Sequence, residues 1–263
     1  MFNTFLVHPI FNLLAFIYGY VHDFGVAIII LTIIVRLILW PLVTKQLHSQ
    51  RALQELQPEL KKIKEQAKGD RTLEGQLTME LYKEREINPF ASFLPLFIQL
   101  PIFFALFIVL KDIVKPGEIA HLAYPFVKSL PAIAELISDK TAFHPTLLGI
   151  VDLTKPSVII AVLAALAQFW QTKMLQPKHT KDDPQAQVMA GMTYLFPGFT
   201  LIIGLSWPAA LSLYWTAGSA MAIIQQYIVL RRDVEELEEG VLITTPTTST
   251  SKPKKRGKGK RKG

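Results

Sequence analysis

The chain has 263 residues, of which 50% are hydrophobic and 19% charged, and its formal net charge is +7. Its mean hydropathy is +0.31. A water-soluble domain of this length normally interrupts its apolar stretches with charge far more often. No cysteine is present, which excludes disulfides, thiol nucleophiles and cysteine-bound metals.

Residues 1–23 come first and contain no Lys or Arg, which argues against a cleaved secretory signal. Their apolar side chains recur at helical spacing: Phe2, Phe5, Leu6, Ile10, Leu13, Leu14 and Ile17. This spacing predicts an amphipathic helix that lies in the membrane interface on the outer side. A short additional transmembrane span is the alternative interpretation.

Five later stretches are apolar and long enough to cross a hydrocarbon core about 30 Å thick as α-helices. They are residues 24–42, 89–111, 156–175, 188–205 and 208–230. Helices are expected because lipid cannot satisfy exposed backbone hydrogen-bonding groups. The sequence therefore predicts an all-α integral membrane protein with five transmembrane helices.

Lys and Arg are distributed unevenly among the segments between these stretches. None falls in residues 1–23, nine fall in 43–88, four in 112–155, two in 176–187 and ten in 231–263. Because cytoplasmic loops are enriched in Lys and Arg, we expect the N-terminus outside and the C-terminus in the cytoplasm. The extracytoplasmic loop is then 112–155, and 176–187 is cytoplasmic.

Residues 43–88 are predicted to form a cytoplasmic helical hairpin, with Pro58 kinking its first helix. Two apolar stripes flank a turn at Gly69 and Asp70. The first contains Leu47, Leu53, Leu56, Leu60, Ile63 and Ala67, and the second contains Leu73, Leu77 and Leu81. A solvated charged linker is the alternative interpretation.

Arg36 is the most informative residue, because it lies inside the first predicted span. An Arg near the bilayer centre costs about 2.5 to 3.5 kcal/mol on insertion scales. None of the other four spans contains Asp or Glu, so no salt bridge across the membrane interior can offset this cost. Either the side chain reaches the cytoplasmic interface by snorkelling, or polar groups and water inside the membrane solvate it.

Polar side chains at comparable depth favour a hydrated cavity. They are Thr32, Gln99, Gln168, Gln171, Ser212, Thr216 and Ser219. A single amide is often ordinary glue between helices, but several around an unpaired Arg would line a wet cavity. Tyr214 and Trp215 lie well inside the fifth span, which favours packing or cavity lining over a place in an interfacial aromatic belt.

Several sequence blocks resemble the YidC family of membrane protein insertases and their mitochondrial and chloroplast relatives. The blocks are IVRLILWPL, LQPELKKIKE, MELYKEREINP, FLPLFIQLPIFFALF, FWQTKM and LYWTAGSAMAIIQQ, and the resemblance extends from Gly25 to Leu230. It implies five helices around a hydrophilic groove that is open to the cytoplasm and to lipid, in a bacterial cell membrane. It also implies that Arg36, Gln171 and Trp215 line the groove, with Tyr214 beside Trp215.

The chain ends in KPKKRGKGKRKG, within residues 231–263, which we expect to be disordered. Its cationic side chains are candidates for binding ribosomal RNA, with anionic lipid head groups as the alternative. They include Lys254, Lys255, Arg256, Lys258, Lys260, Arg261 and Lys262. The expected partners are nascent membrane proteins, the ribosome, the lipid bilayer and the general secretion channel, the last left open.

The predicted function is insertion and assisted folding of membrane proteins, without nucleotide hydrolysis, since no phosphate-binding loop is present. No enzyme activity, catalytic residue, cofactor or metal is expected. The alternative is a channel or small-anion transporter that uses the same Arg36, although we find no internal repeat. A membrane protease is disfavoured because GxSxG and HExxH are absent. An assembly scaffold without insertion activity cannot be distinguished from sequence.

Overall fold

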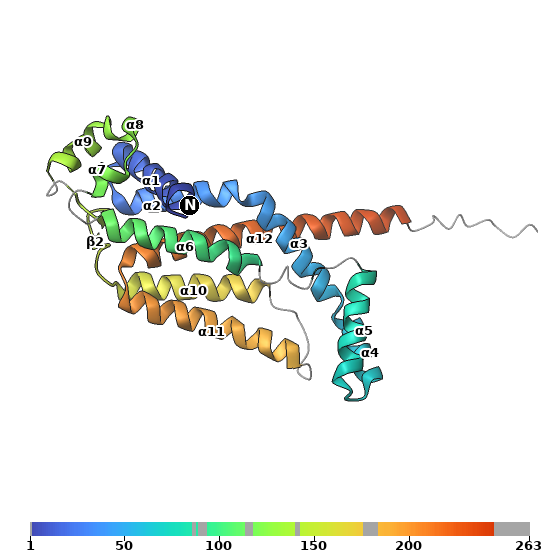
Figure 1. Ribbon diagram of the computed structural model, residues 1–263. Helices are drawn as coiled ribbons and strands as arrows, with labels where there is room; N and C mark the ends of the chain where they lie inside the picture. The colour runs from blue at the N-terminus through green and yellow to red at the C-terminus, as the bar shows by residue number, and fades with distance from the viewer. Residues whose placement is uncertain are drawn as a thin grey trace, which may run out of the picture.

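The computed structural model describes residues 2–85, 88, 94–113, 118–139, 143–175 and 184–244, which are mostly helical (Figure 1). The elements in chain order are a π-helical segment η1 (Asn3–Val7), then α1 (His8–Val21), α2 (Phe24–Ile38), α3 (Trp40–Glu55), α4 (Gln57–Ala67), α5 (Arg71–Glu84), α6 (Leu94–Ile113), α7 (Glu118–Leu122), α8 (Pro125–Lys128), α9 (Pro131–Ser138), β1 (Thr146–Leu147), β2 (Val151–Asp152), α10 (Val158–Met174), α11 (Pro184–Ser206) and α12 (Ala209–Thr244).

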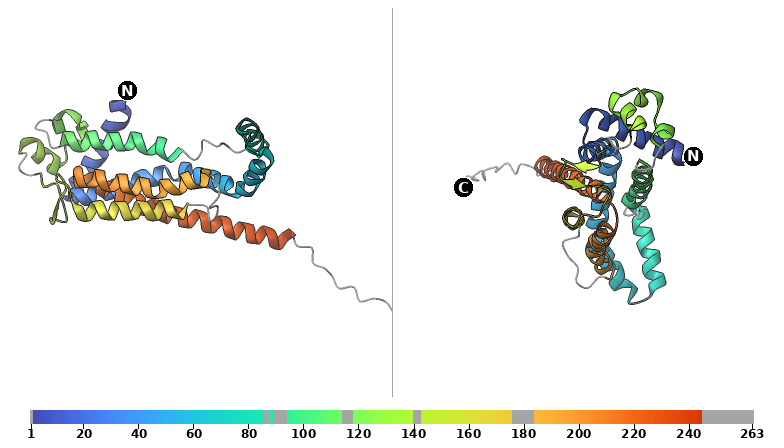
Figure 2. Two further views of the ribbon diagram at one scale, coloured as in Figure 1. Left: turned by 90° about the horizontal axis from the view of Figure 1, so that it is seen from below. Right: turned by 90° about the vertical axis from the view of Figure 1, so that its left-hand side faces the viewer.

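Helices α2, α6, α10, α11 and α12 run roughly side by side and form the body of the molecule (Figure 1). Helix α10 packs against α11 and α12, and α12 packs in turn against α2. The α4–α5 hairpin projects at one end of this bundle, and α7, α8 and α9 gather at the opposite end. Helix α1 crosses the direction of α6 and α10 (Figure 2).

A sharp bend of 64° separates α2 from α3. Pro41 lies in the first turn of α3 and has no N–H to continue the hydrogen-bond ladder of α2. Helix α2 therefore ends at Ile38, whereas the predicted span extended to residue 42. The bend places Arg36 in the last turn of α2.

The second break in this region separates α3 from α4 at Leu56 and precedes Pro58, which lies in the first turn of α4. The helices α4 and α5 then pack against each other. Lys68 and Gly69 take left-handed backbone conformations at the turn, and the Asp70 carboxylate accepts hydrogen bonds from the backbone N–H groups of the first turn of α5. The geometry is that of a helical hairpin.

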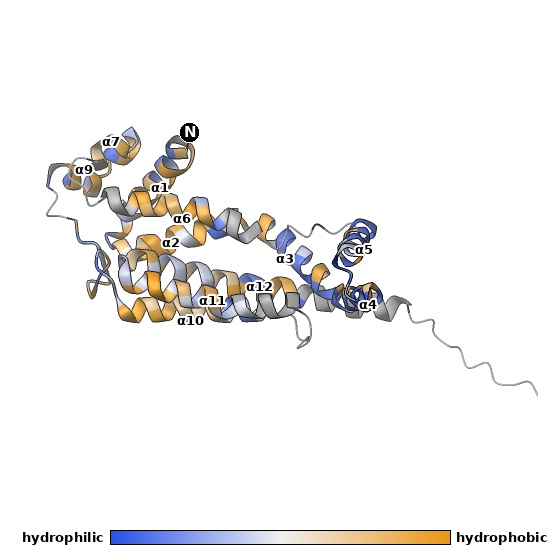
Figure 3. Cartoon of the chain, turned by 60° about the horizontal axis from the view of Figure 1, so that its bottom comes forward, coloured by the Kyte–Doolittle hydropathy of each residue, from blue (hydrophilic) through white to orange (hydrophobic). Residues whose placement is uncertain are grey.

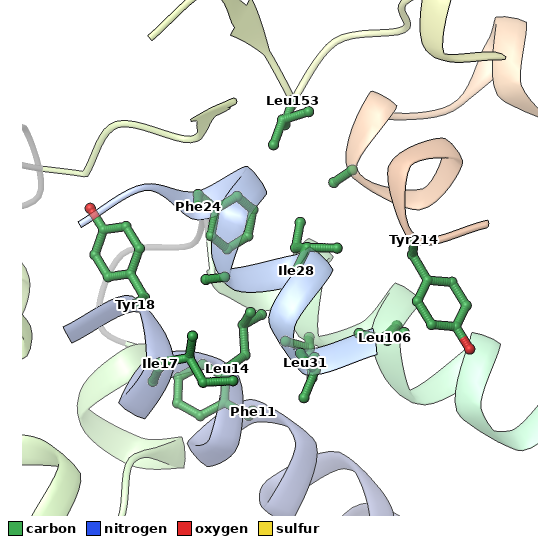
Figure 4. Close-up of a cluster of buried hydrophobic side chains, with 14 of the residues drawn as sticks. Phe11, Leu14, Ile17, Tyr18, Phe24, Ile28, Leu31, Leu106, Leu153 and Tyr214 are labelled. Carbon is green, nitrogen blue, oxygen red and sulfur yellow. The ribbon is translucent and has the colours of Figure 1, made fainter. Parts of the chain in front are cut away.

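Buried apolar side chains of α1, α2 and the loop before α10 belong to one hydrophobic cluster (Figure 4). The rings of Tyr18, Phe24 and Phe143 contact one another edge to face. The loop after β2 is tied to the start of α12, since the backbone N–H of Ala210 donates to the carbonyl oxygen of Leu153. The paired strands β1 and β2 are a local exception to the all-α prediction, which assigned no strand.

Beside an apolar core, the molecule exposes many large apolar side chains and buries several uncharged polar ones. Hydrophobic residues occupy much of α10 and α11 (Figure 3). Large exposed hydrophobic residues there include Ile159, Leu163, Leu166, Leu195, Phe199 and Ile202, whereas Thr193, Thr200, Ser212, Ser219, Gln225 and Gln226 are buried. This distribution suits a lipid environment.

By length and composition, one helix within the described residues, Asn3–Val21, suffices to cross a membrane. A second does so if the bent pair α2 and α3 is counted as one span, and shorter apolar stretches lie in α6, α10 and α11. The interfacial placement of residues 1–23 and the five-span topology stay predictions. Helix α12 continues to Thr244, beyond residue 230, where the predicted fifth span ended.

Candidate functional site

Arg36 lies where three helices of the bundle meet. Its guanidinium Nη2 donates a long hydrogen bond of 3.4 Å to Oε1 of Gln99 on α6. The amide Nε2 of Gln99 donates in turn to the hydroxyl of Tyr214 on α12, at 2.9 Å. A polar chain therefore joins α2, α6 and α12, and it contains three of the residues predicted for the site.

Gly218 gives the guanidinium room to lie against α12. A Cβ atom built at this position would be 3.1 Å from Nη2 of Arg36. Tyr214 and Gly218 are four residues apart, so they occupy the same face of α12. Among the described residues Arg36 forms no ion pair with a carboxylate, and its hydrogen-bond partner is a neutral amide.

Thr32 and Trp215 are two further predicted site residues, and each makes a defined contact in the structure. Thr32 lies one turn before Arg36, but its buried hydroxyl donates to the carbonyl oxygen of Ile28 in its own helix. Trp215 is partly buried and packs against Phe103 of α6, with ring centroids 5.1 Å apart. Phe103 also stacks on Trp207, so Trp215 belongs to an aromatic contact between α6 and α12.

The two predicted glutamines of α10 differ. The hydroxyl of Ser219 donates to Oε1 of Gln168 at 3.2 Å, which makes a second polar link between helices. Gln171 is half-buried, and no hydrogen bond joins its amide to another described residue. Its predicted place in a groove stays a prediction, as does the groove itself.

A further polar contact, between α3 and α12, was not predicted from the sequence. The amide of Gln225 donates to the backbone carbonyl of Trp40 at 3.1 Å, directly after the bend. Within the described residues, four buried side-chain oxygens near this end of the bundle have no protein hydrogen-bond partner: those of Thr44, Gln50, Gln57 and Gln226. Gln225 and Gln226 are adjacent inside an apolar stretch, and this pattern could have predicted the contact.

The basic side chains proposed to bind ribosomal RNA or lipid head groups lie outside the described residues. They are Lys254, Lys255, Arg256, Lys258, Lys260, Arg261 and Lys262. The bundle exposes apolar side chains and links polar side chains in its interior. These features place the protein in the class of α-helical membrane proteins.

The chain belongs to the 60Kd inner membrane protein family, whose sequence model matches residues 16–236. It is 35% identical over 213 residues to the membrane protein insertase YidC of Fusobacterium nucleatum, covering 81% of this chain and 89% of that protein. It is 34% identical over 228 residues to the YidC protein of Rickettsia conorii, covering 85% of this chain but only 38% of that protein. The chain therefore matches most of the Fusobacterium protein but less than half of the Rickettsia protein.

A solved structure described as an active YidC insertase, with its first transmembrane domain resolved, is similar in fold. Its TM-score against this chain is 0.54 at 25% sequence identity, and the match covers 84% of this chain and 45% of that one. The resemblance inferred from the sequence blocks is thereby confirmed at the level of the family.

Proposed function

We propose that this protein inserts other membrane proteins into the lipid bilayer of a bacterial cell, and that Arg36 provides the attractive charge of a hydrated groove. The observation that carries the proposal is the Arg36 guanidinium, held between α2, α6 and α12 and hydrogen-bonded to a neutral amide rather than to a carboxylate. The insertase names of the relatives support the same activity.

The physical role of such a site is to reduce the barrier for a polar segment of the incoming protein. A polar or acidic segment that enters hydrocarbon loses its hydrogen bonds to water. Water in the groove would supply them again, and Arg36 would attract a carboxylate. At an effective dielectric constant of 20, an acidic group about 8 Å away gains roughly 2 kcal/mol.

Burial of the substrate's own apolar residues drives the remainder of the process. A helix of about 20 apolar residues gains several kcal/mol on leaving the groove for lipid. No nucleotide is needed for that step. In this scheme the groove opens to the cytoplasm and to lipid, with the α4–α5 hairpin in the cytoplasm and α7, α8 and α9 on the outer side, since these groups lie at opposite ends of the bundle (Figure 1).

The decisive experiment compares Arg36→Ala and Arg36→Lys with the unchanged protein in reconstituted vesicles. The substrates are two single-span proteins that differ only in whether the translocated tail is acidic or neutral. Arg36→Ala should slow insertion of the acidic substrate roughly thirtyfold, which corresponds to about 2 kcal/mol. Arg36→Lys should lie between, because it keeps the charge but loses the planar guanidinium.

The matched control is Lys45→Ala, which removes one positive charge from an exposed position on α3. It should leave both rates unchanged. Normal insertion of every substrate by Arg36→Ala would eliminate the electrostatic part of the proposal. Crosslinking from positions 36, 171 and 215 to a nascent chain tests the groove directly, and failure at all three would count against it.

The same vesicles discriminate the alternative of a channel or small-anion transporter. Flux of a small anion that disappears in Arg36→Ala would favour this alternative, since an unpaired intramembrane Arg is also suited to binding an anion. If the protein is an insertase, the vesicles should show insertion of substrate proteins without flux of the small anion.

The basic C-terminal segment is proposed to hold the ribosome near the insertion site, because eight of its last twelve residues are Lys or Arg. Ribosome co-sedimentation with and without residues 252–263 tests this. Unchanged binding after the deletion would remove the ribosome from the proposed partners of the tail and leave lipid head groups. Association with the general secretion channel is a separate question, which co-purification from membranes addresses.

A further inference from the structure

The turn between β1 and β2 has an unusual residue at its first corner. The strands pair with Thr146 opposite Asp152 and Leu147 opposite Val151. The backbone N–H of Ile150 donates to the carbonyl oxygen of Leu147, and Leu148 and Gly149 have φ angles of 53° and 68°. Two successive left-handed residues make the tight hairpin turn that normally selects Asn, Asp or Gly. A leucine there works against local stability.

The side chains of this turn do not compensate by packing into the core. Leu148 is 67% exposed, and Ile150 is 83% exposed. Leu153, in the same loop, is fully buried. The fold therefore accommodates an apolar side chain close to the turn. The two apolar side chains at the tip therefore face the surroundings of the protein.

The tip is held in a defined position rather than left to move freely. One carboxylate oxygen of Asp23 accepts from the N–H of Val26 at 2.8 Å and so caps α2, while the other accepts from the N–H of Leu148 at 2.6 Å. The chain also passes so close to α2 that a Cβ atom on Gly25 would be 2.9 Å from the Cα of Leu147. Asp23 and Gly25 thus fix the turn to the start of α2.

The turn lies at the same end of the bundle as α7, α8 and α9, beside the start of α10 (Figures 1 and 2). The first turn of α10 is itself apolar and open, with Ile159 73% exposed. Between the two, the chain is polar: the Asp152 carboxylate pairs with Lys155 at 2.8 Å and accepts from Thr154. An exposed apolar tip, a polar base and an exposed apolar helix start therefore lie near one another at this end of the bundle.

We propose that Leu148 and Ile150 enter the lipid leaflet next to this end of the bundle and anchor the start of α10 at a set depth. The partner is the glycerol and upper acyl-chain region of the lipids. The exposed apolar start of α10 beside the turn favours lipid, and two side chains offer far less than the roughly 800 Å² per partner of a stable protein interface. The proposal requires that the protein reside in a bilayer but does not depend on its insertion activity.

The absence of cysteine from the chain makes a clean test possible. Ile150→Cys is labelled with an environment-sensitive fluorophore in the full-length protein, reconstituted in phosphatidylcholine and phosphatidylglycerol vesicles. Thr154→Cys, an exposed position on the polar base of the same loop, is the matched control. Lipids with brominated acyl chains then serve as quenchers.

The label at 150 should emit at shorter wavelength than the label at 154 and should be quenched by the brominated lipids, while the label at 154 should not. Equal, water-like emission at both positions would overturn the proposal. A blue-shifted but unquenched label at 150 would also overturn it, because it would indicate a protein partner or a second copy of this chain.

A second variant, Leu148→Asn, separates anchoring from folding. Asn tolerates the left-handed conformation, so the melting temperature should stay the same or rise. The ratio of lipid-inserted to water-exposed label at 150 should nevertheless fall about tenfold, which is the effect of exposing one leucine side chain. An unchanged ratio would show that Leu148 does not contact lipid and would refute its part of the anchor.

Discussion

The two ends of α2 lie in opposite surroundings. At its start, Phe24, Ile28 and Leu31 are buried among aromatic and aliphatic side chains of α1 and the loop before α10. In its last turn, Arg36 donates to the Gln99 amide of α6, which donates in turn to the Tyr214 hydroxyl of α12, and Leu37 and Ile38 are exposed. One helix therefore carries both a tightly packed anchor and a polar site.

This difference explains how the polar site can exist. A charge inside a helical bundle is unfavourable, and the helix that carries it must be held by interactions elsewhere. The packed end of α2 provides them, since it buries several large apolar side chains and is capped by Asp23. Substitutions at the two ends should consequently affect different properties.

The largest effect is expected at the packed end. Phe24→Ala removes a buried ring that contacts both Tyr18 and Phe143, which should lower the free energy of unfolding by about 3 to 5 kcal/mol. Thermal unfolding in nanodiscs measures this. Phe199→Ala, at an exposed position on α11, is the control and should change stability by less than about 1 kcal/mol. Equal losses would mean that the Phe24 ring is packed no more tightly than an exposed ring on α11.

A smaller loss is expected for Gly25→Ala. The new Cβ would lie 2.5 Å from Cδ1 and 2.9 Å from Cα of Leu147, so the loop must shift, at about 1 to 3 kcal/mol. Gly198→Ala is the matched control, because no atom lies within 4 Å of its Cβ position and Ala favours a helix by about 1 kcal/mol over Gly. Opposite shifts of the melting temperature are expected, and shifts of the same sign would contradict the close approach.

At the polar end, Tyr214→Phe should be milder for stability. It removes the hydroxyl that accepts from Gln99, and an unpaired buried amide donor costs about 1 to 2 kcal/mol. Tyr194→Phe, exposed on α11, should leave the melting temperature unchanged. If Tyr214→Phe behaves like this control, the chain from Arg36 through Gln99 to Tyr214 does not contribute to stability.

The smallest effect is expected at the surface ion pair of the loop. The hydrogen bonds from Lys155 and Thr154 hold the pKa of Asp152 down at about 2. A lowered pKa stabilises the folded state above the unfolded value of about 4, and this contribution is lost as the pH falls through about 2. The small melting-temperature difference between Asp152→Asn and the unchanged protein should therefore stay constant from pH 7 to pH 5. A difference that disappears within this interval would contradict the lowered pKa.

Local features of the structure were predicted where a single residue decides the backbone. Gly69 and Asp70 marked the turn of the α4–α5 hairpin because glycine permits a left-handed turn and aspartate caps the next helix. The helix break after Ile38 was not predicted, because apolar residues lie on both sides of Pro41 and hydropathy does not distinguish a proline that breaks a helix from one that begins the next. The turn between β1 and β2 was not predicted from the sequence, since a leucine, Leu148, is atypical of the left-handed conformation.

The sequence by itself determined the class of protein and the isolation of Arg36, because both depend on composition: apolar stretches longer than 17 residues and spans without Asp or Glu. Only the tertiary structure decided which groups meet the guanidinium. The hydrogen bond of Arg36 goes to Gln99, although the family resemblance named Gln171 and not Gln99 beside it. The reason is that partners so far apart in the chain are selected by the packing of α2, α6 and α12, and no local pattern encodes that packing.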